Sequence, residues 1–294
     1  MSDPATPPMG IGDTIVRAMR LYLAHTNTLY AIVAIFMVPV TLAMILMFTS
    51  FVDQRFWDFD PQADPFRGLD RSEIGRFVLI VAGGGFLNFV ATVLAIGASF
   101  HALAGTLGGT RPTSKSSIAT ELQKVGRLAW LPLLVFLLLL AGTFVIGFVI
   151  GLIAAVAEEA AVLGWLALIA AAIFFLVLWS VAIPVVMAEG RGGATALRRS
   201  AELIRGSWWR TFGIYFIVFL ITLGVSLAIG AIFDRGGIES SADLTLSMLG
   251  GLVTSILVTP LYAAVLTLVY LDRAERRTVP EPEPPPDEPT ATAL

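Results

Sequence analysis

Three aspartates are spaced so that their carboxylates could hold a calcium ion. Asp58, Asp60 and Asp64 lie in residues 53–73, a segment that also carries three arginines and four aromatic residues. An EF-hand loop needs a glycine at its sixth position and a bidentate glutamate at its twelfth, and neither stands at the required spacing here. We therefore predict a solvated loop whose aromatic side chains lie at a membrane interface, and no metal site.

A second pair of carboxylates could in principle supply a general acid and a general base. Glu158 and Glu159 are adjacent in sequence, however, and no histidine or second acidic cluster accompanies them. The chain has two histidines and no cysteine, which excludes a cysteine nucleophile, a thiolate metal site and a disulfide. We predict a hairpin turn at the two glutamates, and a protein that is not an enzyme and takes no cofactor.

Polar side chains inside apolar segments are a further class of candidate. Asn88 follows the glycine run 83–85, and Thr259 precedes Pro260 in a polar stretch near the end of the chain. A polar side chain at membrane depth is costly unless it faces the bundle interior, so both residues are candidate intramembrane contacts. The alternative for Asn88 is an interhelical hydrogen bond worth about 1 kcal/mol or less, and for Thr259 a bond to nearby backbone around the proline.

The most informative stretch, residues 188–220, turns from a basic helix into a continuous apolar segment. Apolar residues recur there at spacings of three and four from Ala194 to Trp208, whereas Arg198, Arg199 and Arg205 project elsewhere. Tryptophans such as Trp208 are typical of the lipid headgroup level. We predict an amphipathic helix on the membrane surface. Its candidate lipid- or partner-contacting residues are Arg198, Arg199, Arg205 and Arg210.

The hydrophobic composition of the chain predicts the helices that position these residues. The 294 residues are 56% hydrophobic and 14% charged, with a mean hydropathy of +0.83, which is not the composition of a soluble domain. A hydrocarbon core about 30 Å thick needs roughly 20 apolar residues per helix. Six such runs predict an all-α integral membrane protein with six transmembrane helices: 29–48, 77–97, 128–149, 163–187, 212–233 and 246–268.

The distribution of basic residues predicts the orientation of these spans. Fourteen lysines and arginines lie before the first span, after the last, or in the connections that follow the second and fourth spans, whereas five lie in the remaining connections. By the positive-inside rule, we expect a protein of the plasma membrane with both termini on the cytoplasmic side. The first ten residues lack the basic start of a secretory signal, so the first span is expected to be retained.

The membrane part also divides into three similar units. Each unit would comprise a cytoplasmic interfacial amphipathic helix and a hairpin of two spans, over residues 10–108, 112–189 and 190–273. The flanking segments have a different composition. Residues 1–9 are predicted to be disordered, and residues 278–294 form a proline- and glutamate-rich tail that is also predicted to be disordered.

Three segments carry a resemblance to a known family: GIGDTIVRAMRLY, IPVVMAEGRGGATALRRSAELIRGSWWRTFGIYFIVFL and PLYAAVLTLVYLDRAERR. They resemble bacterial and archaeal six-span membrane proteins related to the membrane domain found fused to glycerophosphodiester phosphodiesterases. The resemblance covers residues 10–277 and implies an integral membrane module. In the fused proteins the phosphodiesterase activity belongs to a separate soluble barrel domain. This chain lacks the length and the histidine and carboxylate set of that barrel, so the activity is not expected here.

Two classes of function agree with these features. The first is a non-catalytic membrane module that contacts anionic lipid, or a membrane-protein partner, through its basic interfacial helices. The second is a transporter of lipid or another small amphiphile, which proline-interrupted spans and the polar groups near Asn88 and Thr259 would suit. Repeats that all begin on the same side are parallel, unlike the inverted repeats of many ion-coupled carriers. We expect the lipid bilayer as the partner and no nucleic acid.

Overall fold

The computed structural model describes residues 10–51, 71–109, 158–233 and 240–278, with scattered residues between 130 and 151. Within these residues every element is a helix and no strand occurs. The helices are α1 (Ile11–Ala24), α2 (Thr26–Phe51), α3 (Arg71–Leu107), α5 (Glu158–Leu178), α6 (Ala182–Glu189), α7 (Ala194–Ile204), the short 3-10 helix η2 (Arg205–Ser207), α8 (Trp208–Phe233) and α9 (Ser241–Thr278).

Five helical stretches are long and apolar enough to cross a membrane, so the chain is a multi-pass membrane protein. They are Thr26–Ser50, Gly75–Leu107, Val162–Glu189, Ala194–Phe233 and Ser241–Arg276. The predicted span at 128–149 falls in a segment of which only scattered residues are described, so a sixth span stays a prediction. Three further predictions lie outside the described residues: the loop with Asp58, Asp60 and Asp64, the interfacial helix at the start of the second unit (112–189), and the two disordered ends.

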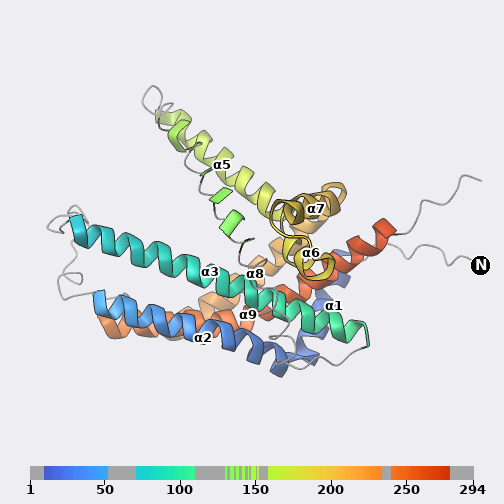
Figure 1. The fold of residues 1–294 in the computed structure, drawn as a ribbon, viewed down its shortest axis with the longest axis horizontal. Helices are drawn as coiled ribbons and strands as arrows, with labels where there is room; N and C mark the ends of the chain where they lie inside the picture. Colours follow the sequence, from blue (N-terminus) through green and yellow to red (C-terminus); the bar gives the residue numbers. More distant parts are fainter. Residues whose placement is uncertain are drawn as a thin grey trace, which may run out of the picture.

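The long helices lie in pairs that run in opposite directions (Figure 1). α2 packs along α3, and α8 packs along α9. α9 is the central helix, because it also contacts α1, α2, α3, α6 and α7. Small side chains permit this close packing: Ala263, Ala264 and Thr267 are fully buried, and the Thr267 hydroxyl donates to the Ala263 carbonyl at 2.7 Å.

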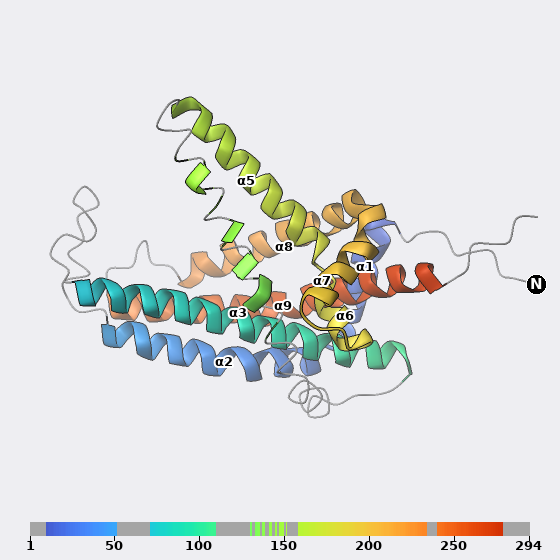
Figure 2. The same ribbon diagram turned by 45° about the horizontal axis from the view of Figure 1, so that its top comes forward.

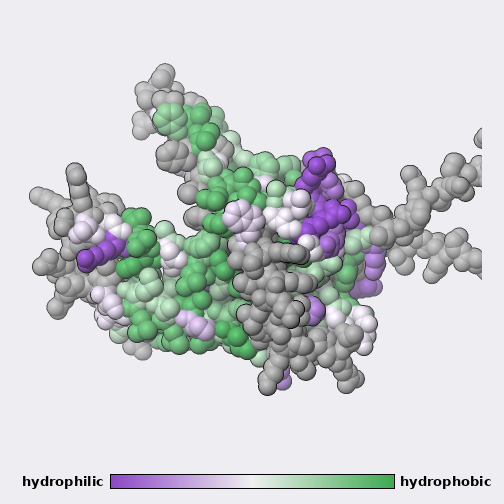
Figure 3. Space-filling model, in the orientation of Figure 1, coloured by the Kyte–Doolittle hydropathy of each residue, from purple (hydrophilic) through white to green (hydrophobic). Residues whose placement is uncertain are grey.

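Most of the buried core lies where α1, α6 and α7 meet the ends of the long helices. Figure 1 shows these three short helices at the same end of the bundle. Leu103, Val185 and Ile204 are buried there against Val265 of α9. Large apolar side chains are instead exposed along the flanks of the long helices, such as Leu163, which is 69% exposed. Figure 3 shows the same division, with an apolar flank and a strongly hydrophilic surface around α7. Exposed apolar flanks of this size are typical of helices that face lipid.

The predicted span 163–187 is not one continuous helix, because it is interrupted between α5 and α6 at Trp179–Val181. Pro184 explains the interruption: it has no N–H for the Ser180 carbonyl four residues earlier, and its ring would clash there. Pro39 and Pro260, by contrast, lie inside helices that continue past them. α5 then diverges from α2 and α3 in both views (Figures 1 and 2) and contacts α7 and α8.

A buried serine satisfies the backbone at this interruption. The Ser200 hydroxyl of α7 donates to the Leu178 carbonyl at 2.8 Å, and Ser200 is fully buried. The N–H of Ala182, which a continuous helix would aim at Leu178, donates instead to Trp179. Ser200 therefore fixes α7 to the end of α5.

We expect Ser200→Ala to lower the free energy of unfolding by roughly 1–2 kcal/mol, because the buried Leu178 carbonyl would lose its donor. Thermal unfolding of the purified protein in detergent would measure the change. Thr195→Ala is the matched control, since the Thr195 hydroxyl is exposed and bonds locally to Gly192. Equal melting temperatures for the Ser200 variant and the wild type would contradict this role.

Candidate anion-binding groove at the arginine-rich end

Two glycines shape the turn that brings α7 back against α6. Gly190 ends α6 in the left-handed conformation, with φ 68°, which is the usual C-terminal helix cap. Gly193 precedes α7 with φ 57° and ψ −135°, a combination that side chains with a Cβ atom disfavour strongly. The sequence Glu-Gly-Arg-Gly-Gly thus supplies glycine at the two positions where the backbone requires it.

The turn places Glu189 at the centre of a first ionic cluster. Its carboxylate lies 3.1 Å from the Nε atom of Arg191 and 3.2 Å from that of Arg199. The Tyr270 hydroxyl of α9 donates to the same carboxylate at 3.4 Å. This Glu189 cluster joins the α6–α7 turn, α7 and α9 at the end of the bundle.

Asp272 is the centre of a second cluster, which joins α8 to α9. Its side chain is only 7% exposed, and it accepts hydrogen bonds from Arg210 of α8 at 3.2 Å and from Arg276 at 3.0 Å. Arg273 lies 3.8 Å from the same carboxylate. A carboxylate is almost never buried this completely without a charged partner, and three guanidinium groups surround this one.

Trp208 connects the start of α8 to the end of α5. Its indole N–H donates to the Phe174 carbonyl at 3.2 Å. Its ring stacks on the ring of Phe174 at a centroid distance of 5.5 Å, and on Phe212 at 5.2 Å. Amphipathic rings of this kind have one apolar face and one polar edge, which suits the boundary between hydrocarbon and water.

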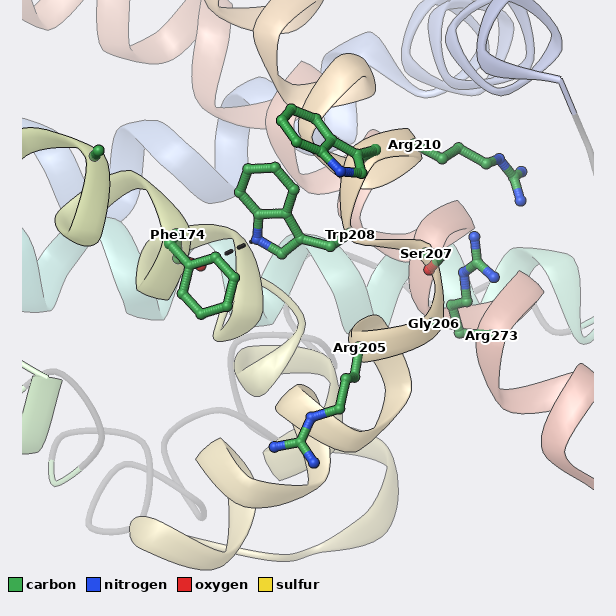
Figure 4. Close-up of a pocket in the computed structure, with 9 residues that line it drawn as sticks. Phe174, Arg205, Gly206, Ser207, Trp208, Arg210 and Arg273 are labelled. Atoms are coloured by element: carbon green, nitrogen blue, oxygen red, sulfur yellow. Dashed lines mark hydrogen bonds between the residues drawn. The ribbon is translucent and has the colours of Figure 1, made fainter.

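Between α5, η2, the start of α8 and α9 lies an open cavity of about 840 Å³, which we call the arginine groove (Figure 4). It is lined by Ala170, Phe174, Arg205, Gly206, Ser207, Trp208, Trp209, Arg210 and Arg273. These lining residues include three arginines and no acidic residue. Arg210 and Arg273 extend to one side of η2, whereas Arg205 extends to the other. The groove therefore combines an aromatic wall with positive charge on both of its sides.

The four predicted contact arginines occupy different environments. Arg198 is 85% exposed and pairs with Glu202 at 3.2 Å, as its spacing predicts. Arg199 belongs to the Glu189 cluster and Arg210 to the Asp272 cluster, so both have structural partners. Arg205 is exposed in the arginine groove, and within the described residues its side chain makes no ion pair. Of these four arginines, Arg198 and Arg205 thus present the most accessible guanidinium groups.

The predicted apolar stripe of α7 also differs from the observed one. Leu197 and Ile204 are buried as expected, but Ala194 is exposed, and Ala196, Ser200 and Leu203 are buried. The reason is tertiary packing, since α7 buries its side chains against α5, α6 and α9. A single apolar stripe along α7 could not contact α5, α6 and α9 at once, so more than one face of α7 is buried.

The intramembrane candidates do not belong to the groove. Asn88 lies on an exposed part of α3, where its backbone carbonyl accepts from the Thr92 hydroxyl at 2.8 Å. Thr259 is 8% exposed on α9. Neither residue lines the arginine groove, so the structure does not bring them together with the four arginines.

Sequence reasoning missed the acidic centres of the two clusters. Glu189 and Asp272 each stand at the end of an apolar run and have arginines within four residues. A lone acid at such a position signals a partly buried ion pair. The sequence identifies Arg273 only as a basic residue after the last apolar run. Its place in the groove depends on the contact between α8 and α9, which no local pattern reveals.

The described residues contain no group of three histidine, cysteine or acidic side chains that could hold a metal ion. The three arginines and the aromatic rings that line the groove suit recognition of an anion beside an apolar surface. Comparison with protein-family models, with curated proteins and with solved structures found no match for this chain.

Proposed function

We propose that this protein is a non-catalytic membrane module that contacts anionic lipid through its arginine-rich end. One observation carries the proposal: ten arginines of the described helices and turns gather at one end of the bundle, with five acidic residues. The arginines are Arg17, Arg20, Arg191, Arg198, Arg199, Arg205, Arg210, Arg273, Arg276 and Arg277. The acids are Asp13, Glu189, Glu202, Asp272 and Glu275.

This arrangement supports a cytoplasmic position for that end, with α1 and α7 as interfacial helices. Anionic lipids give the cytoplasmic leaflet a negative surface potential, and each basic residue near it contributes about 1 kcal/mol of attraction. Arg199, Arg210 and Arg273 are partly buried in the two ionic clusters. The exposed side chains of Arg191, Arg198 and Arg205 are accessible to lipid headgroups. The proposal includes the six-span topology and the family resemblance drawn from the sequence.

The test is the lipid selectivity of the reconstituted protein. Electron paramagnetic resonance of spin-labelled lipids would compare phosphatidylglycerol with phosphatidylcholine at the protein surface. We expect the protein to prefer phosphatidylglycerol, and the preference to weaken with salt because exposed charges are screened. Replacing Arg191, Arg198 and Arg205 together by glutamine should remove most of the preference.

Arg76→Gln is the control for this experiment, because Arg76 is an exposed arginine near the opposite end of α3. It should leave the preference unchanged. An unaltered preference in the triple variant would refute the proposed lipid contact. A partner protein with an acidic surface is the other occupant of this end, and native mass spectrometry of gently extracted protein would detect a stoichiometric complex.

The second candidate function, transport of an amphiphile, is favoured by the interruption between α5 and α6 beside the groove. Irregular backbone in a membrane protein commonly lines a substrate pathway. Proteoliposomes that contain fluorescent lipid would show whether the protein moves lipid between leaflets. A translocation rate equal to that of protein-free vesicles would remove this candidate for lipid.

A further inference from the structure

We infer that the arginine groove binds one anionic phospholipid molecule of the surrounding leaflet. Its phosphate would lie at Arg205, and its acyl chains would lie against the wall formed by Ala170, Phe174 and Trp208. This inference rests on the proposed contact with anionic lipid. It narrows a general attraction to one saturable site.

The groove has the composition of a site for an amphiphile. Three arginines and the Ser207 hydroxyl provide the polar part, and the apolar part is formed by the side chains of α5 and α8. The volume of about 840 Å³ lies within the range of about 300–1,000 Å³ that is usual for small-molecule sites. A ligand with an anionic head and an apolar body would use both parts.

The apolar wall of the groove continues along α5 toward the hydrocarbon. Leu166 is 58% exposed, Ile169 is 54% exposed and Ile173 is 39% exposed. These three residues lie beside Ala170 and Phe174 in the sequence of the same helix. A lipid seated in the groove could therefore keep its acyl chains in the bilayer while its headgroup reaches the arginines.

Arg205 is the arginine best suited to hold the phosphate. Arg210 and Arg273 already lie beside Asp272, and Figure 4 shows them on the other side of η2. The Arg205 side chain makes no ion pair with any residue that the structure describes. A guanidinium group donates in a planar fork that matches two phosphate oxygens. A phosphodiester carries one negative charge, which a single arginine neutralises.

The acyl chains distinguish a lipid from a soluble phosphate ester. A soluble ester would use Arg205 but would leave Phe174 and Trp208 in contact with water. A phospholipid covers both side chains, so burial of apolar surface adds to the charge attraction. For this reason we commit to the lipid as the occupant.

Native mass spectrometry of the full chain would test the site directly. The protein would be titrated with phosphatidylglycerol or phosphatidylcholine of the same acyl length, and the affinity of the first bound lipid would be measured. We expect Arg205→Gln to weaken the first phosphatidylglycerol about fivefold, since one basic residue contributes about 1 kcal/mol. Arg198→Gln is the comparison: Arg198 is exposed nearby and belongs to the general lipid contact but does not line the groove, so it should weaken the first phosphatidylglycerol less than Arg205→Gln does. Arg76→Gln, near the opposite end of α3, is the control that should leave this affinity unchanged.

A second pair of variants tests the apolar wall without changing charge. Ala170→Phe places a large ring in the groove and should weaken the first phosphatidylglycerol at least as much as Arg205→Gln does. Ala167→Phe adds the same ring at an exposed position of α5 that does not line the groove, and it should have no effect. Both are additions on an exposed helix surface, so folding is expected to survive, and melting temperatures would verify this.

The outcomes separate this inference from the proposed function. Equal losses in Arg205→Gln and Arg198→Gln, with Ala170→Phe unchanged, would overturn the single site and leave only a diffuse attraction to anionic lipid. Absence of any preference for phosphatidylglycerol, here and in the spin-label measurement, would overturn both. Glycerol 3-phosphate should not displace the first lipid at millimolar concentration; displacement would show that the groove recognises a soluble phosphate ester and would overturn the assignment to lipid.

Discussion

Asp272→Asn is expected to lower the free energy of unfolding by about 2–3 kcal/mol. Removing one partner of a fully buried ion pair costs roughly 3–5 kcal/mol. The value here is smaller because the three surrounding arginines are 15–34% exposed, so that water screens part of their charge. The amide keeps only one of the two acceptor oxygens that Arg210 and Arg276 use, and it has no charge to neutralise Arg210, Arg273 and Arg276. Thermal unfolding in detergent would measure the loss.

The same substitution should strengthen the attraction of the groove for anions. Arg210 and Arg273 line the groove and share the Asp272 carboxylate, so removal of this charge makes the groove more positive. We expect added phosphatidylglycerol to raise the melting temperature of the variant more than that of the wild type. Glu275→Gln removes an exposed negative charge from the same helix end. It should change little either the melting temperature or the increase in melting temperature that phosphatidylglycerol causes. An Asp272→Asn variant as stable as the wild type would refute the role of the Asp272 cluster.

Gly193→Val should lower the free energy of unfolding by about 3 kcal/mol. The backbone of Gly193 has φ 57° and ψ −135°, and a non-glycine residue in such a region costs about 1–3 kcal/mol, with β-branched residues at the upper end. A Cβ atom would also lie 3.1 Å from Cδ1 of the Trp130 ring. Relaxation of the turn would move α7, and with it Arg199 of the Glu189 cluster. Thermal unfolding of the purified variant in detergent would measure the loss of stability.

Gly206→Ala is the control for the glycine substitution. An added Cβ atom at Gly206 meets no atom within 4 Å, and the φ angle of Gly206 is not positive. The melting temperature of Gly206→Ala should therefore stay close to that of the wild type. If Gly193→Val had a melting temperature equal to that of Gly206→Ala, the turn would not require glycine, and the geometry assigned to it would be wrong.

Much of the helical architecture follows from the sequence because hydropathy alone determines which segments can enter a bilayer. The apolar runs at 29–48, 77–97, 212–233 and 246–268 all lie within described helices. The spacing of Arg198 and Glu202, four residues apart on one helix, accounts in the same way for their ion pair at 3.2 Å. These features depend on composition or on one turn of helix.

The groove could not be predicted in the same way, because its parts come from distant segments. Phe174 and Trp208 are 34 residues apart and Arg210 and Asp272 are 62 apart, and only the packing of α5, α8 and α9 brings them together. The burial of α7 was mispredicted for the same reason. Hydropathy identified its apolar residues, but the number of neighbouring helices decides how many of its faces are buried.

The central position of α9 has a consequence for how the protein is made. Membrane insertion delivers helices in the order of their synthesis, and α9 follows every other described helix in the sequence. α2 and α3 pack against each other and can pair before α9 is made. The surfaces that contact α9 belong to α1, α2, α3, α6, α7 and α8, and they remain uncovered until α9 is inserted. Completion of the bundle therefore requires the synthesis of α9, and the ribosome must have passed Asp272 before α8 acquires the anion that holds it in place.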